Sequence, residues 1–164
     1  VLPGAALDGR SVFELMEAER VTQSAGVPTV WLGLLQHVQS SGLRFSSMRR
    51  TLIGGSACSP AMIRSFHELG VEVRHGWGMT EMSPLGTVST LKFRQRELPE
   101  DAQLAFRAKQ GRALFGVGVR IVDGEGRELP WDGKSSGDLH VRGPWVVSGY
   151  FKHAGGDPLQ DGWF

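Results

Sequence analysis

The centre of this sequence is the segment Val71-Glu72-Val73-Arg74-His75-Gly76-Trp77-Gly78-Met79-Thr80-Glu81. Its first four residues alternate apolar and charged side chains, which is the two-residue period of a strand. The run Gly76-Trp77-Gly78 is then predicted to end the strand, and its glycines let a ligand approach the backbone closely. An indole, the hydroxyl of Thr80 and the carboxylate of Glu81 would together suit a magnesium-bound nucleotide. A strand that ends in a glycine-rich turn with a packed tryptophan is the alternative.

This segment closes a predicted strand–helix–strand unit. Strands are predicted over residues 50–53 and 71–74, with a helix over 61–69 between them. The short connections favour two parallel strands joined by the helix. Two glycine-rich breaks, Gly54-Gly55 and Gly76-Trp77-Gly78, then fall at the carboxyl ends of the strands, where open α/β sheets bind their ligands.

Further elements are predicted on both sides of this unit. Ser11 and Glu14 have the spacing of a capping box, so a helix is expected over 12–19. A second helix is expected over 29–40, where apolar residues recur at helical spacing. Extended segments at 21–22 and a charged helix at 100–110 complete these predictions.

The sequence pattern changes after residue 91, where the predicted elements become shorter. Short alternating segments at 117–122 and 138–142, and a possible strand at 146–151, are typical of a small antiparallel sheet or barrel. The predicted fold class is therefore α/β: a βαβ portion of a parallel sheet, followed by a small antiparallel β-barrel-like subdomain. The corresponding domains are 1–91 and 92–164.

The composition excludes several classes of protein. The 164 residues are 40% hydrophobic and 21% charged, with a net charge of +1, which argues against a dedicated nucleic-acid binder. No apolar run approaches the length of a membrane span. The single cysteine, Cys58, fits a reducing compartment, so a cytoplasmic location is expected. The five histidines show no metal-ligand spacing.

Several blocks, in order along the chain, resemble the adenylate-forming ligase superfamily, most closely its medium- and long-chain fatty acyl-CoA synthetases. Gly54-Gly55-Ser56-Ala57 resembles the adenine-edge loop of that family. The run Gly76 to Glu81 resembles its Tyr-Gly-Met-Thr-Glu motif, with Trp77 in place of the tyrosine. The stretch that leads to the family's ribose-binding Thr-Gly-Asp is matched by Gly137 to Pro144, Ser148-Gly149-Tyr150 and Asp161 to Phe164.

The resemblance implies an ATP-dependent, AMP-forming acid–thiol ligase with a partial acyl-CoA synthetase-like fold. Such an enzyme activates a fatty acid with ATP and Mg2+ to an acyl-adenylate and passes the acyl group to coenzyme A. Small-molecule substrates are the implied partners, and a homodimer is possible by analogy. Thr80 and Glu81 are the candidate catalytic residues, with Glu81 as the ligand of Mg2+ and Thr80 on the adenylate phosphate.

The resemblance also implies a set of binding residues. The adenylate would be held by Gly55, Ser56, Ala57, His75, Gly76, Trp77, Gly78, Met79 and Thr80. Trp31 would gate the acyl tunnel, with Gly76 and Gly78 beside the acyl chain; as an indole on an apolar helix face, it equally suits a hydrophobic core.

The match departs from the family pattern in ways that limit the expected activity. The family's lysine-bearing phosphate loop, its ribose-binding aspartate and its C-terminal domain have no counterpart in this sequence. The chain is therefore expected to be a catalytically inactive piece of the large domain. A ligase for an aromatic or aminoacyl substrate, or a non-catalytic nucleotide-binding module, are the alternative functions.

Two features are expected to play no catalytic part. Cys58 is expected to be an inert buried thiol near a helix start. Lys92, Arg94 and Arg96 suggest either a basic surface near the nucleotide entrance or a solvated face, and the acidic residues that follow favour the solvated face.

Overall fold

A computed structural model describes residues 1–152 and 157–164, and these form two compact units. The first unit contains residues 1–77 and 87–112, and the second contains residues 78–86 and 113–164. The domain boundary after residue 91 stays a prediction.

The first unit is built on parallel strands, as the sequence predicts. β1 (Gln23–Gly26), β2 (Arg50–Ile53) and β3 (Glu72–Gly78) pair side by side in parallel register. With β4 (Leu85–Val88) and β5 (Arg112–Ala113), the strand order is β1-β2-β3-β4-β5. The α/β class and the parallel unit are therefore confirmed.

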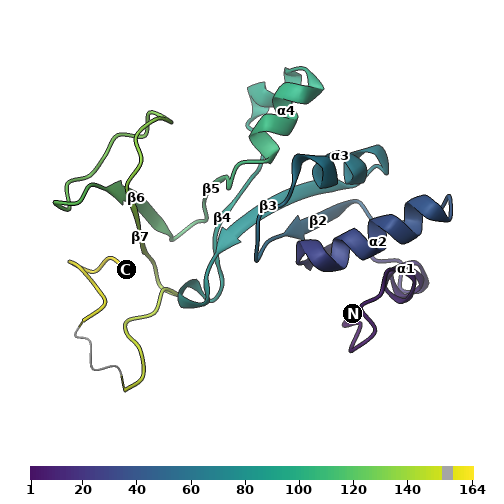
Figure 1. Cartoon of the computed structure of the whole chain (residues 1–164), viewed down its shortest axis with the longest axis horizontal. Coiled ribbons are helices and arrows are strands. Elements are labelled where there is room, and N and C mark those ends of the chain that lie inside the picture. Colours follow the sequence, from purple (N-terminus) through teal and green to yellow (C-terminus); the bar gives the residue numbers. More distant parts are fainter. Residues whose placement is uncertain (153–156) are drawn as a thin grey trace. The chain divides into compact units, whose positions relative to one another are not determined.

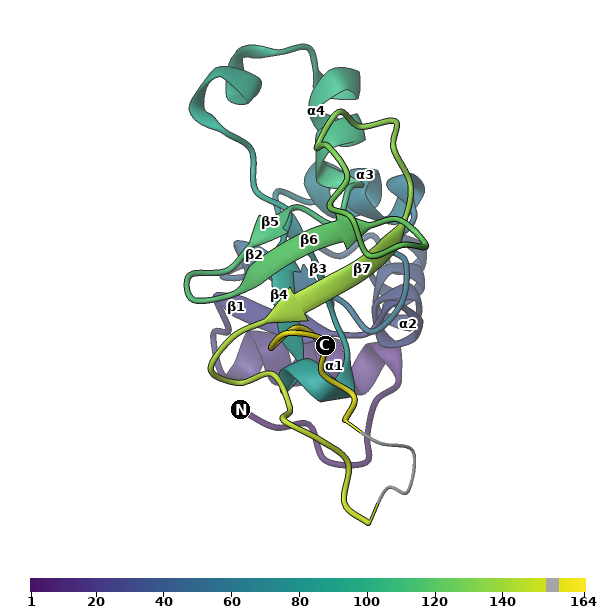
Figure 2. The same ribbon diagram turned by 90° about the vertical axis from the view of Figure 1, so that its left-hand side faces the viewer.

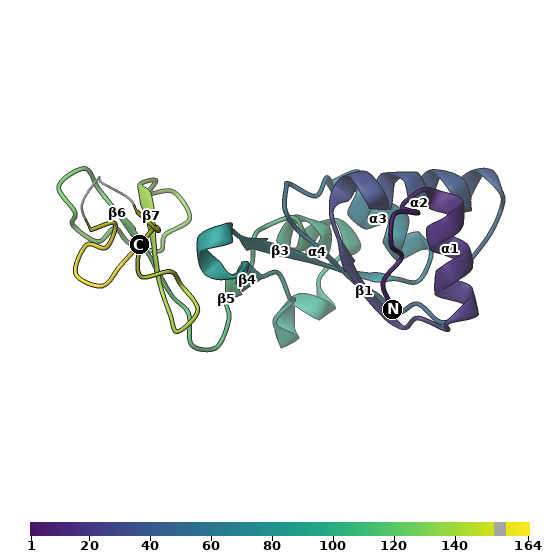
Figure 3. The same cartoon turned by 90° about the horizontal axis from the view of Figure 1, so that it is seen from below.

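Helices α2 (Pro28–Ser40) and α3 (Pro60–Glu68) connect the three parallel strands (Figure 1). α1 (Gly9–Ala18) packs beside α2, as Figure 3 also shows. Further along lie the 3-10 segment η2 (Phe93–Glu97) and helix α4 (Glu100–Arg107), which packs on α3. A continuous apolar core joins the sheet to the helices; its members include Val12, Trp31, Leu34, Leu35, Val38, Ile53, Ile63, Phe66 and Val73.

Helix ends depend on caps, and one predicted cap is wrong. α1 begins at Gly9, and its N-cap is Asp8, whose Oδ1 accepts the Ser11 N–H at 3.0 Å. Ser11 therefore lies inside the helix, and the predicted capping box with Glu14 does not form. At α3 the prediction holds, because the Ser59 hydroxyl accepts the Met62 N–H and proline follows the cap.

The predicted end of β3 is also wrong, because the strand continues through Gly76 and Trp77 to Gly78. Neighbouring backbone keeps this stretch extended: the Ser89 N–H donates to the His75 carbonyl at 2.7 Å. The first strand likewise lies at Gln23–Gly26 rather than at 21–22. These differences shift element ends and leave the order of elements unchanged.

The second unit is centred on an antiparallel pair, β6 (Gly118–Val122) and β7 (Asp138–Arg142), drawn in Figure 2. The buried apolar residues on these two strands are Val122 and Val141. The 3-10 turn η1 (Thr80–Met82) belongs to the same unit. The predicted strand at 146–151 is wrong, since turns and irregular backbone occupy that stretch. The antiparallel character is confirmed, although no closed barrel forms within residues 113–152 and 157–164.

Candidate functional site

The glycine-rich ends of β2 and β3 lie against each other. A Cβ atom built on Gly54 would come within 3.0 Å of the Gly76 carbonyl oxygen. The Gly54 N–H in turn donates to the carbonyl of Gly26, at the end of β1, over 3.2 Å. A side chain at position 54 would crowd this carbonyl, so glycine suits the close approach of the two strand ends. The predicted meeting of the two breaks at one sheet edge is thus present.

The loop that follows these glycines contains Ser56 and Ala57. It is exposed, and a hydrogen bond to His75 holds its far end. Gly55 adopts a left-handed backbone with φ +81°, which redirects the chain after β2. The Cys58 N–H, at the far end of the loop, donates to Nε2 of His75 over 3.2 Å. Nδ1 of the same ring lies 3.2 Å from the Ala108 carbonyl. Since Nε2 accepts, Nδ1 carries the proton and donates to that oxygen.

His75 is only 2% exposed, and both of its ring nitrogens are engaged with backbone groups. The imidazole therefore anchors the Gly55–Cys58 loop to the backbone beyond α4. The sequence suggests direct contact with a nucleotide; the observed contacts give this ring a positioning role at the same edge.

Cys58 carries none of the features of a nucleophile. Its side chain is buried, with 4% exposure, and burial raises the pKa of the thiol to about 11. The thiolate is the reactive form, so very little of it is present near neutral pH. The expectation of an inert thiol follows from this environment.

Thr80 and Glu81 lie in η1, in the second unit, directly after the glycine-rich end of β3. Thr80 is exposed, and Glu81 is partly exposed. The Tyr150 hydroxyl donates to Oε1 of Glu81 at 2.8 Å. The N–H of Glu81 itself and this hydroxyl lower the pKa of the Glu81 carboxyl, so the group is ionised at neutral pH.

Backbone contacts fix the turn that carries Glu81. The Val147 N–H donates to the Glu81 carbonyl at 2.8 Å. A Cβ atom on Gly78 would collide with the carbonyl oxygen of Pro84, so the chain folds back on itself at this glycine. Glu81 is therefore held from its side chain and from its backbone by the segment 147–150.

The structure distributes the predicted site residues over the two units. The first unit holds Gly55, Ser56 and Ala57 in the loop after β2, and His75, Gly76 and Trp77 near the end of β3; His75 is hydrogen-bonded to Cys58 at the end of that loop. Gly78, Met79, Thr80 and Glu81 belong to the second unit. That both groups bind one nucleotide stays a prediction.

Trp31 lies over the end of β1, where its ring reaches within 2.7 Å of a Cβ atom built on Gly26. It is 3% exposed and makes an edge-on contact with Phe66 at 6.3 Å between ring centroids. Trp31 also lines a pocket of about 550 Å³, whose lining is mostly apolar and comes from the N-terminal segment, α1, β1 and the start of α2. The indole is thus a core residue that also forms part of a pocket wall.

The described residues contain no group of three or more His, Cys, Asp or Glu side chains arranged to hold a metal ion. His153 lies outside the described residues. Within residues 1–152 and 157–164, no helix combines the length and apolar character needed to cross a bilayer.

Two contacts at this site were not predicted from the sequence. Tyr150 and Glu81 are 69 positions apart, and His75 and Cys58 are 17 apart, so no local pattern reveals either pair. The one available signal was indirect, because Ser148-Gly149-Tyr150 belongs to a block that resembles the ligase family.

Comparisons with known proteins agree with these features. The sequence model of the family described as AMP-binding enzyme matches residues 1–151. The 3-methylmercaptopropionyl-CoA ligase of Ruegeria lacuscaerulensis is 48% identical over 100% of this chain, which is 31% of that protein. The medium-chain-fatty-acid–CoA ligase of Ectopseudomonas oleovorans is also 48% identical over 100% of this chain, and 30% of its own length is covered. The chain thus spans less than a third of these curated relatives.

Solved structures show the same fold. The N-terminal domain of FACL13 from Mycobacterium tuberculosis superposes with a TM-score of 0.78 at 23% identity, over 96% of this chain and 38% of that one. A long-chain-fatty-acid-CoA ligase from Archaeoglobus fulgidus gives a TM-score of 0.77 at 22% identity, over 96% of this chain and 33% of that one.

Proposed function

The chain belongs to the AMP-binding enzyme family, and on this basis we propose that it supplies part of the adenylate site of an acyl-CoA ligase. In the proposed reaction, a carboxylate oxygen of the acid bonds to the α-phosphorus of ATP and pyrophosphate leaves. The thiol of coenzyme A then displaces AMP from the acyl carbon. The family match across residues 1–151 carries the proposal. The meeting of Gly54 and Gly76 at the carboxyl edge of the strands supports it.

In this proposal the first unit binds the adenine end of the nucleotide. The exposed loop with Ser56 and Ala57 would border the base, and Trp77 would offer its indole face for stacking. Gly55 and Gly76 would place backbone beside the ligand, and we propose the same role for Gly78 and Met79 of the second unit. His75 would act through the loop that it anchors at Cys58.

Thr80 and Glu81 would bind the phosphate end of the nucleotide and its Mg2+. Mg2+ is a hard cation that prefers oxygen ligands, and an ionised carboxylate is the ligand it most often takes from a protein. Glu81 fits this requirement, because its pKa is lowered and the residue is partly exposed. When bound, Mg2+ would neutralise phosphate charge. The Thr80 hydroxyl would donate to a phosphate oxygen.

The pocket beside Trp31 is our candidate for part of the acyl site. Its volume of about 550 Å³ lies within the range of small-molecule pockets, and its lining is mostly apolar. We propose a fatty or other aliphatic acid as substrate, because the two relatives with 48% identity are named for a medium-chain fatty acid and for 3-methylmercaptopropionate. Gly76 and Gly78 would lie beside the acyl chain. A cytoplasmic location, supported by the single Cys58, and a homodimer complete the proposal.

The test is a chimera, in which this chain replaces its aligned segment in the medium-chain-fatty-acid–CoA ligase of Ectopseudomonas oleovorans. We expect thioester formation from octanoate and coenzyme A, with lower rates for palmitate and benzoate. Glu81→Ala in the chimera should abolish pyrophosphate exchange, which reports adenylation alone. A folded chimera that binds nucleotide without any exchange would favour the non-catalytic module.

A further inference from the structure

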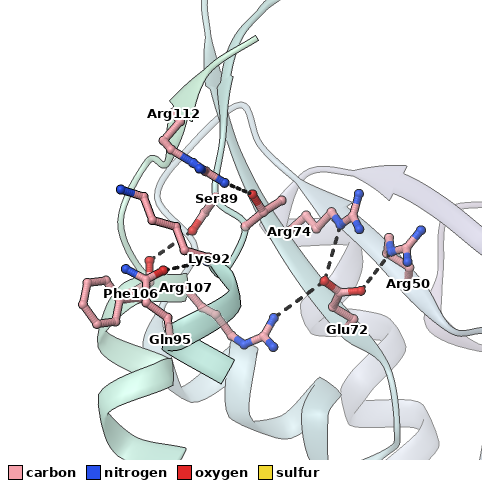
Figure 4. A network of polar contacts seen from close by, with 10 residues as sticks. Arg50, Glu72, Arg74, Ser89, Lys92, Gln95, Phe106, Arg107 and Arg112 are labelled. Carbon is pink, nitrogen blue, oxygen red and sulfur yellow. Dashed lines mark hydrogen bonds and ion pairs between the residues drawn. The ribbon is translucent and has the colours of Figure 1, made fainter. Parts of the chain in front are cut away.

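Beyond the proposed adenylate edge, the first unit carries a basic cluster at the opposite, amino end of β2 and β3. Figure 4 shows its centre, the carboxylate of Glu72, with guanidinium groups directed at it from several sides. Nε of Arg50 donates to Oε2 at 3.0 Å. Oε1 lies 3.5 Å from Nε of Arg74 and 3.9 Å from Nη1 of Arg107.

The sheet register creates this arrangement. Arg50 and Glu72 are direct partners across β2 and β3, so their side chains meet on one face of the sheet. Arg74 follows Glu72 by two positions on the same strand and therefore projects from the same face. Arg107 comes from the last turn of α4. The cluster is thus assembled from regular elements, which hold it in place.

Positive charge is in excess at this point. One carboxylate faces the guanidinium groups of Arg50, Arg74 and Arg107. Arg49 and Arg96 join them in lining a polar hollow of about 520 Å³, where Glu72 is the one carboxylate among the described residues. Burial raises the pKa of Glu72, but the Arg50 hydrogen bond and the surrounding charges outweigh that effect and lower it. Glu72 therefore stays ionised and orients the arginines without neutralising all of them.

Donors remain available in the hollow. Among the described residues, Nη1 and Nη2 of Arg74 donate no hydrogen bond, and the Arg96 side chain makes none. A guanidinium presents a planar fork of N–H donors that matches two oxygens of a phosphate. Several such forks around one concave space suit an anion with more than one phosphate group.

We propose that this hollow, defined by Arg49, Arg50, Arg74, Arg96 and Arg107, binds a small anion that carries linked phosphate groups. The site is separate from the proposed adenylate edge, because it lies at the amino ends of strands whose carboxyl ends carry Gly54 and Gly76. A four-residue strand such as β2 separates its two ends by roughly 10 Å.

The test is calorimetric titration of the 164-residue chain with sodium tripolyphosphate, without Mg2+, in about 50 mM NaCl, where charge interactions are weakly screened. We expect saturable binding to one site. Arg74→Gln and Arg96→Gln should each weaken the affinity about tenfold, which is the usual effect of losing a charge-assisted hydrogen bond. Arg94→Gln is the matched control, because Arg94 is exposed in the same η2 segment but does not line the hollow.

Two further titrations distinguish the hollow from the proposed adenylate site and identify the source of the phosphate chain. Thr80→Ala should leave tripolyphosphate affinity unchanged, and a loss there would assign the anion to the proposed adenylate site instead. In that background, displacement of bound tripolyphosphate by ATP would show that nucleotides also supply the phosphate chain. ATP that does not displace tripolyphosphate would restrict the hollow to free polyphosphates. Either result supports the proposal.

Besides a loss of affinity in Thr80→Ala, three results would overturn the proposal. The first is equal weakening by Arg94→Gln and Arg96→Gln, which would indicate a diffuse surface charge. The second is equally tight binding of a hexaglutamate peptide, which would indicate an acidic protein partner. The third is no saturable heat up to about 5 mM tripolyphosphate. Arg96 is exposed and makes no side-chain hydrogen bond in the described residues, so Arg96→Gln remains informative if Arg74→Gln fails to fold.

Discussion

His75 and Cys58 are joined by a hydrogen bond of 3.2 Å, in which the buried imidazole Nε2 accepts the backbone N–H that ends the Gly55–Cys58 loop. The other ring nitrogen donates to the Ala108 carbonyl. One side chain thus satisfies a buried and a partly buried backbone group from distant parts of the first unit, and such groups are costly to leave unpaired.

His75→Ala is therefore expected to destabilise the chain by about 3 kcal/mol, from two lost hydrogen bonds and a cavity. Urea denaturation followed by circular dichroism measures the change. His67→Ala is the matched control, because His67 is exposed and, among the described residues, the one hydrogen bond of its ring is to Glu100 at 3.1 Å; it should cost less than about 1 kcal/mol. Equal losses of unfolding free energy in the two variants would show that the His75 hydrogen bonds do not stabilise the fold more than an exposed contact does.

The Cys58 thiol should resist modification in the folded chain. Burial raises its pKa to about 11 and leaves 4% of the residue exposed, so thiolate is scarce at pH 8. We expect no reaction with iodoacetamide under native conditions and full reaction in denaturant, measured by mass spectrometry. Labelling in native buffer as rapid as that in denaturant would contradict the described burial.

The Tyr150 hydroxyl should tune the proposed metal ligand. The N–H of Glu81 itself and the Tyr150 hydroxyl lower the pKa of that carboxyl. Tyr150→Phe removes the second hydrogen bond and should leave the carboxylate less well oriented for a cation. In the chimera, we expect the Mg2+ concentration for half-maximal pyrophosphate exchange to rise about fivefold, with a smaller change at saturating Mg2+. Phe151→Leu, an exposed neighbour, is the control. A fall in rate that excess Mg2+ does not restore would argue against this role.

Two glycines should differ in their tolerance of a methyl group. On Gly78 the new Cβ would collide with the Pro84 carbonyl, whereas on Gly54 it would lie 3.0 Å from the Gly76 carbonyl. We expect Gly78→Ala to cost about 3 kcal/mol and Gly54→Ala about 1 kcal/mol, measured by thermal unfolding. The reverse order would mean that the backbone near Pro84 yields more readily than the junction between the β2 and β3 ends.

The pH dependence of the free energy of unfolding should report the contribution of the Glu72 carboxylate. Its pKa in the folded chain lies below the ordinary value of 4.5, so the stabilisation is present above pH 4.5 and is lost as the pH falls through the lower, folded value. Near neutral pH, Glu72→Gln should lower stability by about 1 kcal/mol, since the pair with Arg50 is partly screened by solvent. The difference should vanish in acid. Glu68→Gln, at an exposed carboxylate, should show no such trend.

The sequence was most informative where its signals are local. The β2–α3–β3 unit was predictable because Ser59, Pro60 and Gly70 mark the helix ends and because apolar residues alternate in the strands. The alternation of apolar and polar residues at 117–122 and 138–142 likewise predicted the two strands that pair as β6 and β7.

Prediction failed where distant residues decide the outcome. β3 stays extended through its glycines because Ser89 pairs with His75, and a strand at 146–151 is replaced by a loop that holds Glu81 through Val147. The basic hollow was equally hidden, because Arg50 and Arg107 come together only through register and helix packing. The sequence pointed to basic residues at Lys92, Arg94 and Arg96, but of these only Arg96 lines the hollow.

The register of the parallel strands has a consequence for how quickly this chain reaches its native state. Arg50 meets Gln23 across 27 positions and Glu72 across 22, so each rung of the sheet closes a long loop. Closing each loop costs chain entropy before the strand pair can form its hydrogen bonds, and parallel pairing is slow for this reason. Packing of α1 on α2 also closes a long loop, since Phe13 contacts His37 across 24 positions, so we expect the whole first unit to fold slowly rather than on a helical pair formed early.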